Sequence, residues 1–310
     1  MSKGELKIFA VILNWNNFPD TNNCIKSLLD QNDPRIHIVV VDNHSTDDSV
    51  QLIKSNFPEL DLIVSEKNLG YAGGMNLGIR YALENGADYI IISNNDIVYS
   101  NNFLNPMLEL FSKNPEMGIV SPKVLYLHDR NLIYCSGGEF SYLRASGVAF
   151  NQGKNSELFD NDIREITMAE GSCYLAKSDV FINCGLISEK FFMYFEDLEF
   201  SDRVRKKYKI FYTPFSKVYH KGGAGNSWAN HSSLYYYYYT RNRYIYFSSY
   251  SFIIKIYVLI YSLMVSLAKS FILIKSAKKD RKKLQSLKSL YLGNKDGLKE
   301  LFTKKQKGKV

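Results

Sequence analysis

The stretch IHIVVVDNHSTDDS, residues 36–49, joins a short apolar run to a polar loop and the start of a helix. Its apolar part is β-branched and does not alternate, which is typical of a strand buried on both faces of a parallel sheet. The polar residues 45–48 offer N-cap side chains for a helix through Lys54. This stretch therefore predicts a strand, a loop and a helix in succession.

The same pattern recurs along the first part of the chain. Similar apolar runs lie at 7–13, 60–64 and 89–92, and a helix beginning near Gly73 is expected to end at Gly86. This βαβ series predicts an α/β fold with right-handed crossovers and a ligand crevice at the carboxyl ends of the strands. The later pattern predicts hairpin-like pieces (118–150), a polar loop (151–162), an extended segment (165–175) and a helix (197–207).

Polar residues follow all four of these strands, beginning at Asn14, Asp42, Asn68 and Asn94. Because the carboxyl ends of parallel strands meet at one edge of the sheet, the four loops together indicate a binding site. The third loop ends in Gly73 and Gly74, which permit close backbone approach before a helix N-terminus that favours an anionic phosphate. It lacks the spacings of the common dinucleotide and P-loop motifs.

Two of these loops carry carboxylates with possible roles. Asp96, after Asn94 and Asn95, can hold a hard divalent cation such as Mg²⁺ or Mn²⁺, although Asn and Asp also serve simply to make turns. Asp42 can accept hydrogen bonds from a nucleotide base or ribose, or can cap the next helix.

Two acids in the second half of the chain follow an apolar run. Glu196 and Asp197 come after residues 191–195, which are all large and apolar, so burial would favour a proton-accepting role for one of them. His220 precedes a glycine-rich stretch. A lone histidine of this kind is more often structural than a metal ligand.

Taken together, the motifs resemble the family 2 glycosyltransferases, and within them the rhamnosyltransferase-like branch. The matching stretches are VILNWNN (11–17), VVVDNHSTDDS (39–49), NLGYAGGMNLGI (68–79), GADYIIISNND (86–96), FFMYFEDLEFSDR (191–203) and His220. The resemblance implies a GT-A fold, in which a Rossmann-like nucleotide-binding half with a mixed sheet is fused to an acceptor-binding half. We expect this domain at residues 1–245, and an amphipathic helix with a basic, membrane-associating tail at 246–310.

The resemblance also implies roles for individual residues. Asp197 is similar to the catalytic base, with Glu196 as the neighbouring alternative, and Asp42 to the residue that contacts the base of the nucleotide. Asp96 and His220 are similar to metal ligands for Mg²⁺ or Mn²⁺, although Asn94 stands at the first position of the family's DxD motif. The remaining residues expected to bind the nucleotide sugar are Asn14, Asn68, Gly73, Gly74, Asn76, Asn94 and Asn95.

The implied activity is an inverting transfer from a nucleotide diphosphate sugar to a glycan or lipid-linked acceptor, in bacterial cell-surface polysaccharide synthesis. dTDP-rhamnose is the first candidate donor and UDP-hexoses come next. A catalytically silent sugar-nucleotide-binding scaffold is the alternative from another class. A nucleotidyltransferase would carry glycine and basic residues after the first strand, which residues 14–17 lack. The sequence leaves the linkage and the oligomeric state open.

The charge of the chain is concentrated at its end. Residues 275–310 hold 13 Lys and Arg against 3 Asp and Glu, whereas the whole chain has a net charge of +8, so the preceding residues are near neutral and do not predict nucleic-acid binding. The first fifteen residues do not resemble a signal peptide, and the four scattered cysteines are expected to be free thiols in a reducing cytosol.

The apolar segment 251–274 precedes this basic tail. Its polar residues fall on one narrow helical stripe, namely Ser251, Lys255, Ser262, Ser266 and Lys269. We expect a helix in the membrane interface with both lysines in water and the tail on anionic lipid headgroups. A transmembrane span and a helix docked on the core are the alternatives. This pattern predicts a cytoplasmic protein that is peripheral on the inner face of the cell membrane.

Overall fold

The computed structural model describes residues 6–222, 231–277 and 280–303. The chain forms two compact units. Unit 1 comprises Met1–Phe140, Gly147–Phe192 and Glu196–Gly222, and unit 2 comprises Ser141–Ser146, Met193–Phe195 and Gly223–Val310. The expected domain boundary at residue 245 stays a prediction.

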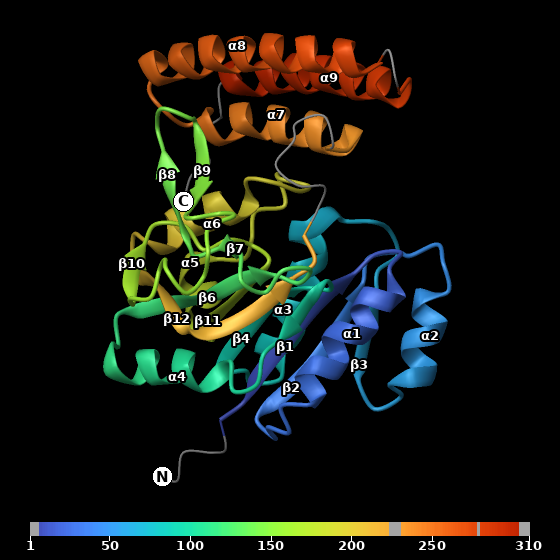
Figure 1. Cartoon of the computed structure of the whole chain (residues 1–310), viewed down its shortest axis with the longest axis vertical. Helices are drawn as coiled ribbons and strands as arrows, with labels where there is room; N and C mark the ends of the chain where they lie inside the picture. The colour runs from blue at the N-terminus through green and yellow to red at the C-terminus, as the bar shows by residue number, and fades with distance from the viewer. Residues whose placement is uncertain (1–5, 223–230, 278–279, 304–310) are drawn as a thin grey trace. The chain divides into compact units, whose positions relative to one another are not determined.

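Unit 1 is built on a ten-stranded mixed sheet in the order β10-β12-β6-β11-β4-β1-β2-β3, with β5 paired to β12 and β7 to β6 (Figure 1). The strands are β1 (Ile8–Asn14), β2 (Ile36–Asp42), β3 (Asp61–Val64), β4 (Tyr89–Asn94), β5 (Ile97–Tyr99), β6 (Met117–Tyr126), β7 (Ile133–Cys135), β10 (Arg164–Ile166), β11 (Cys173–Lys177) and β12 (Lys209–His220). A separate two-stranded sheet contains β8 (Gly138–Ser141) and β9 (Ser146–Ala149). The helices are α1 (Phe18–Leu29), α2 (Ser49–Asn56), α3 (Gly70–Glu84), α4 (Leu104–Lys113), α5 (Ser178–Cys184) and α6 (Glu196–Val204).

The four strands predicted from the apolar runs pair in parallel, as the βαβ pattern predicted. β1 lies between β2 and β4, and β3 lies on the far side of β2. The sheet becomes mixed at β11, which runs antiparallel to both β4 and β6. Asn14 and Asp42 are register partners, so two of the predicted polar loops begin side by side.

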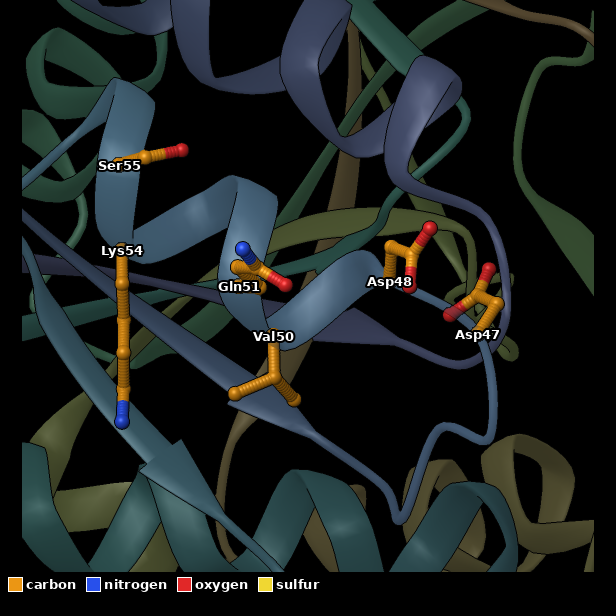
Figure 2. Close-up of a pocket in the computed structure, with 6 residues that line it drawn as sticks. All are labelled: Asp47, Asp48, Val50, Gln51, Lys54 and Ser55. Atoms are coloured by element: carbon orange, nitrogen blue, oxygen red, sulfur yellow. The ribbon is translucent and has the colours of Figure 1, made fainter.

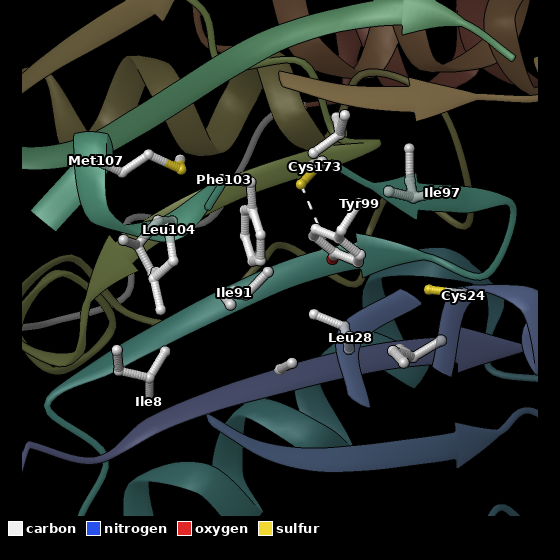
Figure 3. Close-up of a cluster of buried hydrophobic side chains, with 14 of the residues drawn as sticks. Ile8, Cys24, Leu28, Ile91, Ile97, Tyr99, Phe103, Leu104, Met107 and Cys173 are labelled. Carbon is white, nitrogen blue, oxygen red and sulfur yellow. Dashed lines mark hydrogen bonds between the residues drawn. The ribbon is translucent and has the colours of Figure 1, made fainter. Parts of the chain in front are cut away.

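Apolar side chains cover both faces of this sheet. In β1, Ile8, Ala10 and Ile12 join a cluster with side chains of α1 and α4, whereas Phe9 and Val11 join one with side chains of α3, α5 and α6. Figure 3 shows the first cluster, which contains Leu28 of α1, Leu104 of α4 and Ile91 of β4. Because both faces are buried, these strands read as continuous apolar runs.

Helix α3 packs closely on β1. A Cβ atom at Gly78 would lie 2.2 Å from Cγ1 of Val11, so only glycine permits this approach. Gly86 follows the helix with a positive φ of 78°, as predicted. The helix begins at Gly70, one turn earlier than expected from Gly73.

The hairpin-like pieces predicted within 118–150 are present, since β6 and β7 pair antiparallel and β8 and β9, which contain Gly138 and Gly147, form a separate two-stranded sheet. The first of these strands, β6, is a ten-residue strand inside the large sheet. Its Gly, Pro and Lys residues obscure the strand pattern, and the buried ammonium of Lys123 is satisfied by the carbonyl oxygens of Ser156 (2.8 Å) and Phe159 (3.0 Å) in the polar loop. The expected extended segment 165–175 is interrupted between β10 and β11.

Unit 2 contains three long helices, α7 (Ser233–Phe247), α8 (Phe252–Ala277) and α9 (Lys282–Phe302). Helices α7 and α9 are joined by hydrogen bonds between the hydroxyl of Tyr244 and Oδ1 of Asn294 (2.9 Å) and between the hydroxyl of Tyr237 and Oδ2 of Asp296 (3.0 Å). Helix α8 has a mean hydropathy of 1.9 over its most apolar window, and among the described residues it alone is long and apolar enough to cross a membrane.

The expected orientation of α8 is wrong. Lys269 is only 4% exposed, and its ammonium lies 5.2 Å and 5.3 Å from the ring centroids of Tyr235 and Tyr239 in α7. Aromatic ring faces attract cations, so Lys269 packs inside unit 2 instead of meeting water. Of the other stripe residues, Ser262 is buried, Lys255 and Ser266 are half-buried and Ser251 is exposed. The exposed large apolar residues of α8 are Phe252, Ile253, Tyr257, Ile260, Leu263, Met264, Leu267, Phe271, Ile272 and Ile274.

Candidate active site

The loop after β2 is organised around the carboxylate of Asp42. Its Oδ2 accepts hydrogen bonds from Nδ2 of Asn14 (2.7 Å) and Oγ of Ser45 (2.6 Å), and its Oδ1 accepts one from the backbone N–H of Ser45 (2.9 Å). Asp42 and Asn14 are fully buried. Ser45 is therefore a site-shaping residue that the sequence analysis did not single out, and contact of Asp42 with a nucleotide base stays a prediction.

A second series of side-chain hydrogen bonds links β1, α1 and the turn after β4. Nδ2 of Asn95 donates to Oγ1 of Thr21 (2.9 Å), whose hydroxyl donates to Oδ1 of Asn14 (2.6 Å). Asn14 thus connects the Asp42 loop to Asn95. The structure brings these three predicted residues into one hydrogen-bonded network at the carboxyl edge of the sheet.

The loop before α3 is held by paired asparagines. Oδ1 of Asn68 accepts hydrogen bonds from Nδ2 of Asn43 (3.1 Å) and from the backbone N–H of Gly70 (2.9 Å). Gly70 has a φ of 73°, and a Cβ atom there would lie 2.3 Å from the carbonyl oxygen of Phe192. Asn68 therefore fixes the entry into α3, whose first turns carry the buried Gly73 and Gly74.

Asn76 lies apart from these residues. Its Nδ2 donates to the carbonyl oxygen of Ile187 (2.8 Å) and to Oε1 of Glu189 (2.9 Å), and its Oδ1 accepts from the N–H of Ile187 (3.0 Å). All of the hydrogen-bonding groups of this buried side chain are engaged in holding the loop after α5. The structure gives Asn76 a supporting place and leaves its predicted contact with the nucleotide sugar as a prediction.

The predicted metal ligands lie together. Nε2 of His220 is 3.0 Å from Oδ1 of Asp96, and the backbone N–H of Lys221 donates to the carbonyl oxygen of Asp96 (3.0 Å). Burial opposes both charges, but the hydrogen bond between the two groups raises the pKa of His220 and lowers that of Asp96. The ring of Tyr134 stands edge-on to the imidazole at 4.4 Å, which walls the pair off from one side.

The donor set of Asp96 and His220 fits a divalent cation. In the hydrogen bond to Asp96 the proton is on Nε2 of His220, and it would have to leave for Nε2 to bind a metal. Nδ1 of His220 has no hydrogen-bond partner among the described residues, and no group of three or more His, Cys, Asp and Glu side chains that could hold a metal is found among them. One carboxylate and one imidazole leave most of the coordination shell to phosphate oxygens and water, as Mg²⁺ and Mn²⁺ sites in nucleotide enzymes commonly do.

The two candidate bases occupy the first turn of α6. Oδ2 of Asp197 accepts a hydrogen bond from the N–H of Gly171 (3.3 Å) and its Oδ1 accepts one from the N–H of Leu198 (2.7 Å). Burial, followed by the charge of Glu170, raises the pKa of Asp197 to about 6. Burial raises the pKa of Glu196 well above its usual range, and Oε2 of Glu196 has no hydrogen-bond partner among the described residues. Asp197 is therefore the acid of the two that is ionised at neutral pH.

Glu170 is a site residue that the sequence analysis missed. It lies in the interruption between β10 and β11, where it accepts hydrogen bonds from the N–H (3.1 Å) and the hydroxyl of Ser172. The carbonyl oxygen of Ser172 accepts from the N–H of Asn94 (2.9 Å), and Gly171 holds Asp197. The segment 169–172 thus joins the base region to the end of β4. The Gly-Ser pair inside an otherwise extended run was the available signal.

A surface hollow on unit 1 is lined by none of the candidate site residues described above. Figure 2 shows that it runs along α2, and its lining residues are Asp47, Asp48, Val50, Gln51, Lys54 and Ser55. None of these is a predicted site residue. Asp48 is the N-cap of α2 but makes no capping hydrogen bond through its side chain, and Asp47 accepts one from the N–H of Ser49 (3.1 Å).

Comparison with known sequences identifies similar proteins. The model of the family described as "Glycosyl transferase family 2" matches residues 9–183. A low-salt glycan biosynthesis hexosyltransferase of Haloferax volcanii is 27% identical over 199 residues, which are 64% of this chain and 61% of that protein. An N-acetylglucosaminyl-diphospho-decaprenol L-rhamnosyltransferase of Mycobacterium tuberculosis is 24% identical over 227 residues, which cover 64% of this chain and 73% of the relative. The match thus spans about three fifths of the Haloferax protein.

Solved structures show the same fold. A mannosyltransferase from Pyrobaculum calidifontis, in complex with GDP-Man and Mn²⁺, has a TM-score of 0.55 at 13% identity over 96% of this chain and 87% of that chain. GalNAc-T7, crystallised with UDP, GalNAc and Mn²⁺, has a TM-score of 0.57 at 15% identity over 78% of this chain and 51% of that chain. These likenesses confirm the predicted GT-A fold.

Proposed function

Because the chain belongs to glycosyl transferase family 2, we propose that it is a metal-dependent, inverting enzyme that moves one sugar from a nucleotide diphosphate to an acceptor hydroxyl. The observation that carries this proposal is the pair of hydrogen bonds made by the segment 169–172. One links Gly171 to Asp197, and the other links Ser172 to Asn94, at the end of the strand that precedes Asp96. A general base and a place for a diphosphate leaving group are the two parts that such a displacement needs.

In the proposed reaction, Asp197 accepts the proton of the acceptor hydroxyl while the oxygen attacks C1 of the sugar. The bond between C1 and the phosphate oxygen breaks, and the nucleotide diphosphate leaves with the electron pair. A pKa of about 6 suits this role, because the carboxylate is ionised at neutral pH and still basic enough to take a proton. Burial, followed by the charge of Asp197, raises the pKa of Glu196 well above its usual range, which favours the protonated form of Glu196.

The donor is proposed to lie along the carboxyl edge of the sheet. Asp96 and His220 would hold Mg²⁺ or Mn²⁺, which compensates the negative charge of the diphosphate. The buried bonds of Asp42 to Asn14 and Ser45 support a preformed loop for the nucleotide. The other residues proposed to line the donor site are Asn68, Gly73, Gly74, Asn94 and Asn95.

The names of the relatives support a choice of donor. One is a rhamnosyltransferase whose named acceptor is a decaprenol diphosphate glycan, and a Shigella flexneri protein that is 31% identical over 115 residues is named a dTDP-rhamnosyl transferase. We therefore place dTDP-rhamnose first and UDP-hexoses second, with a lipid-linked glycan as acceptor.

Membrane association is proposed through α8. Its outward residues are strongly exposed, with Ile253 at 81% and Phe271 at 75%, and large contiguous apolar surfaces on soluble proteins mark interaction sites. We propose that this face enters the lipid interface from the cytoplasmic side while Lys269 stays inside unit 2. The exposed Arg281 and Lys282 at the start of α9 would meet anionic headgroups.

The proposal is tested by incubating the full chain with a panel of nucleotide sugars, Mg²⁺ or Mn²⁺, and N-acetylglucosaminyl-diphospho-decaprenol, the acceptor that the name of the mycobacterial relative gives. We expect release of the nucleotide diphosphate and a product whose new linkage has the inverted anomeric configuration by NMR. Binding of a nucleotide sugar without turnover of any donor or acceptor would favour the silent scaffold. A product of retained configuration would contradict the single displacement.

A further inference from the structure

Both backbone polar groups of Gly171 are engaged by side chains of unit 1. Its N–H donates a hydrogen bond to Oδ2 of Asp197 (3.3 Å), and its carbonyl oxygen accepts one from the hydroxyl of Tyr71 in the first turn of α3. Asp197 and Tyr71 belong to different helices of unit 1. A side chain of α3 is thus connected to the candidate base through a single residue.

Gly171 is packed between these two side chains. The atoms nearest to a Cβ placed at Gly171 would be Cβ of Asp197 (3.4 Å), the hydroxyl oxygen of Tyr71 (3.5 Å) and Oδ2 of Asp197 (3.7 Å). The backbone of Tyr71 is itself fixed, because its N–H donates to the carbonyl oxygen of Phe192 (2.6 Å). The Tyr71 hydroxyl therefore meets Gly171 from a part of α3 that is held in place.

The Tyr71 hydroxyl acts as a hydrogen-bond donor at neutral pH. Burial raises the pKa of Tyr71 well above its usual range, so the phenol keeps its proton. The ring packs against the apolar cluster on one face of the sheet, and a phenylalanine would fill the same space. The hydrogen bond to Gly171 is therefore the contribution that tyrosine makes here and phenylalanine would not.

We propose that Tyr71 is a positioning residue, which fixes the backbone of Gly171 so that its N–H keeps the carboxylate of Asp197 directed at the acceptor hydroxyl. This inference rests on the proposed role of Asp197 as the base. Tyr71 acts on the carboxylate through Gly171, and a hydrogen bond donated to a carboxylate favours its charged form.

The first test is Tyr71→Phe in the full chain, which removes the hydroxyl and keeps the ring. Displacement of a base by about 1 Å can cost on the order of 10²-fold in rate, so a loosened base should lower kcat by roughly 5- to 50-fold. The KM for the donor should change by less than about twofold. Tyr208→Phe is the matched control and should keep the wild-type kcat, because the Tyr208 hydroxyl bonds Asn183 (2.7 Å) and no candidate site residue. Equal kcat values in the two variants would overturn the inference.

The pH profile separates positioning from packing. The titratable side chains that face Asp197 are Glu170, Glu196, Tyr71, Cys135 and Tyr174. Burial raises the pKa of both tyrosines and of the cysteine, so Tyr71→Phe removes no charge. Loss of the hydrogen bond from Gly171 should raise the pKa of Asp197, so the rise of kcat/KM should move to higher pH by roughly half a unit. A lower kcat with an unmoved profile would show that Tyr71 only packs there and would overturn the inference.

Glu170→Gln should move the same profile in the opposite direction. The amide oxygen can still accept from Ser172, but the charge that raises the pKa of Asp197 is gone, so the rise of kcat/KM should move to lower pH. If neither Tyr71→Phe nor Glu170→Gln moves the profile, the pH dependence does not come from Asp197 and the inference falls.

The Asp197→Asn variant distinguishes the failure of this inference from failure of the proposed function. If Asp197→Asn is inactive while Tyr71→Phe keeps the wild-type kcat and pH profile, only the positioning role falls. If Asp197→Asn keeps full activity, the assigned base is wrong and the positioning role falls with it.

Discussion

Nε2 of His220 lies 3.0 Å from Oδ1 of Asp96, and the pairing of β12 with β5 fixes this approach. His220 is the register partner of Ile97, the residue that follows Asp96 in the chain. The sheet therefore places an imidazole and a carboxylate face to face at a buried end of the strand, without dependence on a flexible loop.

The first prediction follows from this pair. Asp96→Ala should abolish transfer and weaken the Mg²⁺-dependent binding of nucleoside diphosphates, because the diphosphate charge is left uncompensated. His220→Ala should lower activity in the same direction. Calorimetric titration of the nucleotide with and without Mg²⁺ is the measurement. Asp202→Ala, which removes a half-exposed acid of α6, is the control. Full activity of the wild-type chain in EDTA would show that no metal is used.

The second prediction concerns pH. Since the pKa of Asp197 is raised to about 6, the carboxylate is protonated below this pH and cannot accept a proton. We expect kcat/KM to rise about tenfold per pH unit below pH 6 and to level off above it. The residual activity of Asp197→Asn should not show this rise with pH below pH 6. A wild-type profile that is flat between pH 5 and pH 8 would argue against an ionised Asp197 in the reaction.

The third prediction concerns the loop after β2. Asp42→Ala removes the acceptor of three hydrogen bonds from Asn14 and Ser45, so the donor loop should lose its fixed shape. The KM for the donor should rise more than kcat falls, because this contact is the same in the ground state and the transition state. Ser45→Ala should have a smaller effect of the same kind. Initial rates measured at varied donor concentration give KM and kcat separately. Equal losses in kcat and kcat/KM would place Asp42 in the chemical step.

The fourth prediction concerns α8. Ile253→Glu and Phe271→Glu, placed on the exposed apolar face, should together reduce binding to vesicles of anionic lipid by at least tenfold. Leu158→Glu, at an apolar residue of unit 1 that is 76% exposed, is the matched control and should leave binding unchanged. Lys269→Ala should lower the midpoint of thermal unfolding rather than vesicle binding. Undiminished vesicle binding by the double variant would exclude this face as the lipid contact.

The edge of the parallel sheet could be predicted from the sequence, because the short β-branched runs identify the strands. The carboxyl ends of parallel strands then meet at the same edge of the sheet. Asn14 and Asp42 confirm this, as register partners in neighbouring strands. The proximity of Asp96 and His220 came from the resemblance alone, since it depends on the long-range pairing of β12 with β5, for which the local pattern holds no signal.

The features that were missed have physical reasons. Glu170 was hidden in a segment that reads as extended, and it reaches the site only because β11 runs back antiparallel beside β4. The polar stripe of α8 was correctly located on one face of a helix, but periodicity does not tell whether a face meets water or protein. The tyrosines of α7 decide this, since their rings accept Lys269.

The most direct test of the account is the turnover of Asp197→Asn compared with Glu196→Gln, at saturating donor, acceptor and Mg²⁺. Asp197→Asn preserves the shape of the side chain and removes the proton acceptor, so kcat should fall by roughly 10²- to 10⁴-fold with donor binding nearly intact. Glu196→Gln replaces a carboxyl group whose protonated form is favoured by burial, so its effect on kcat should be smaller. The reverse ranking would transfer the role to Glu196, and near-normal turnover in both variants would contradict the proposed mechanism.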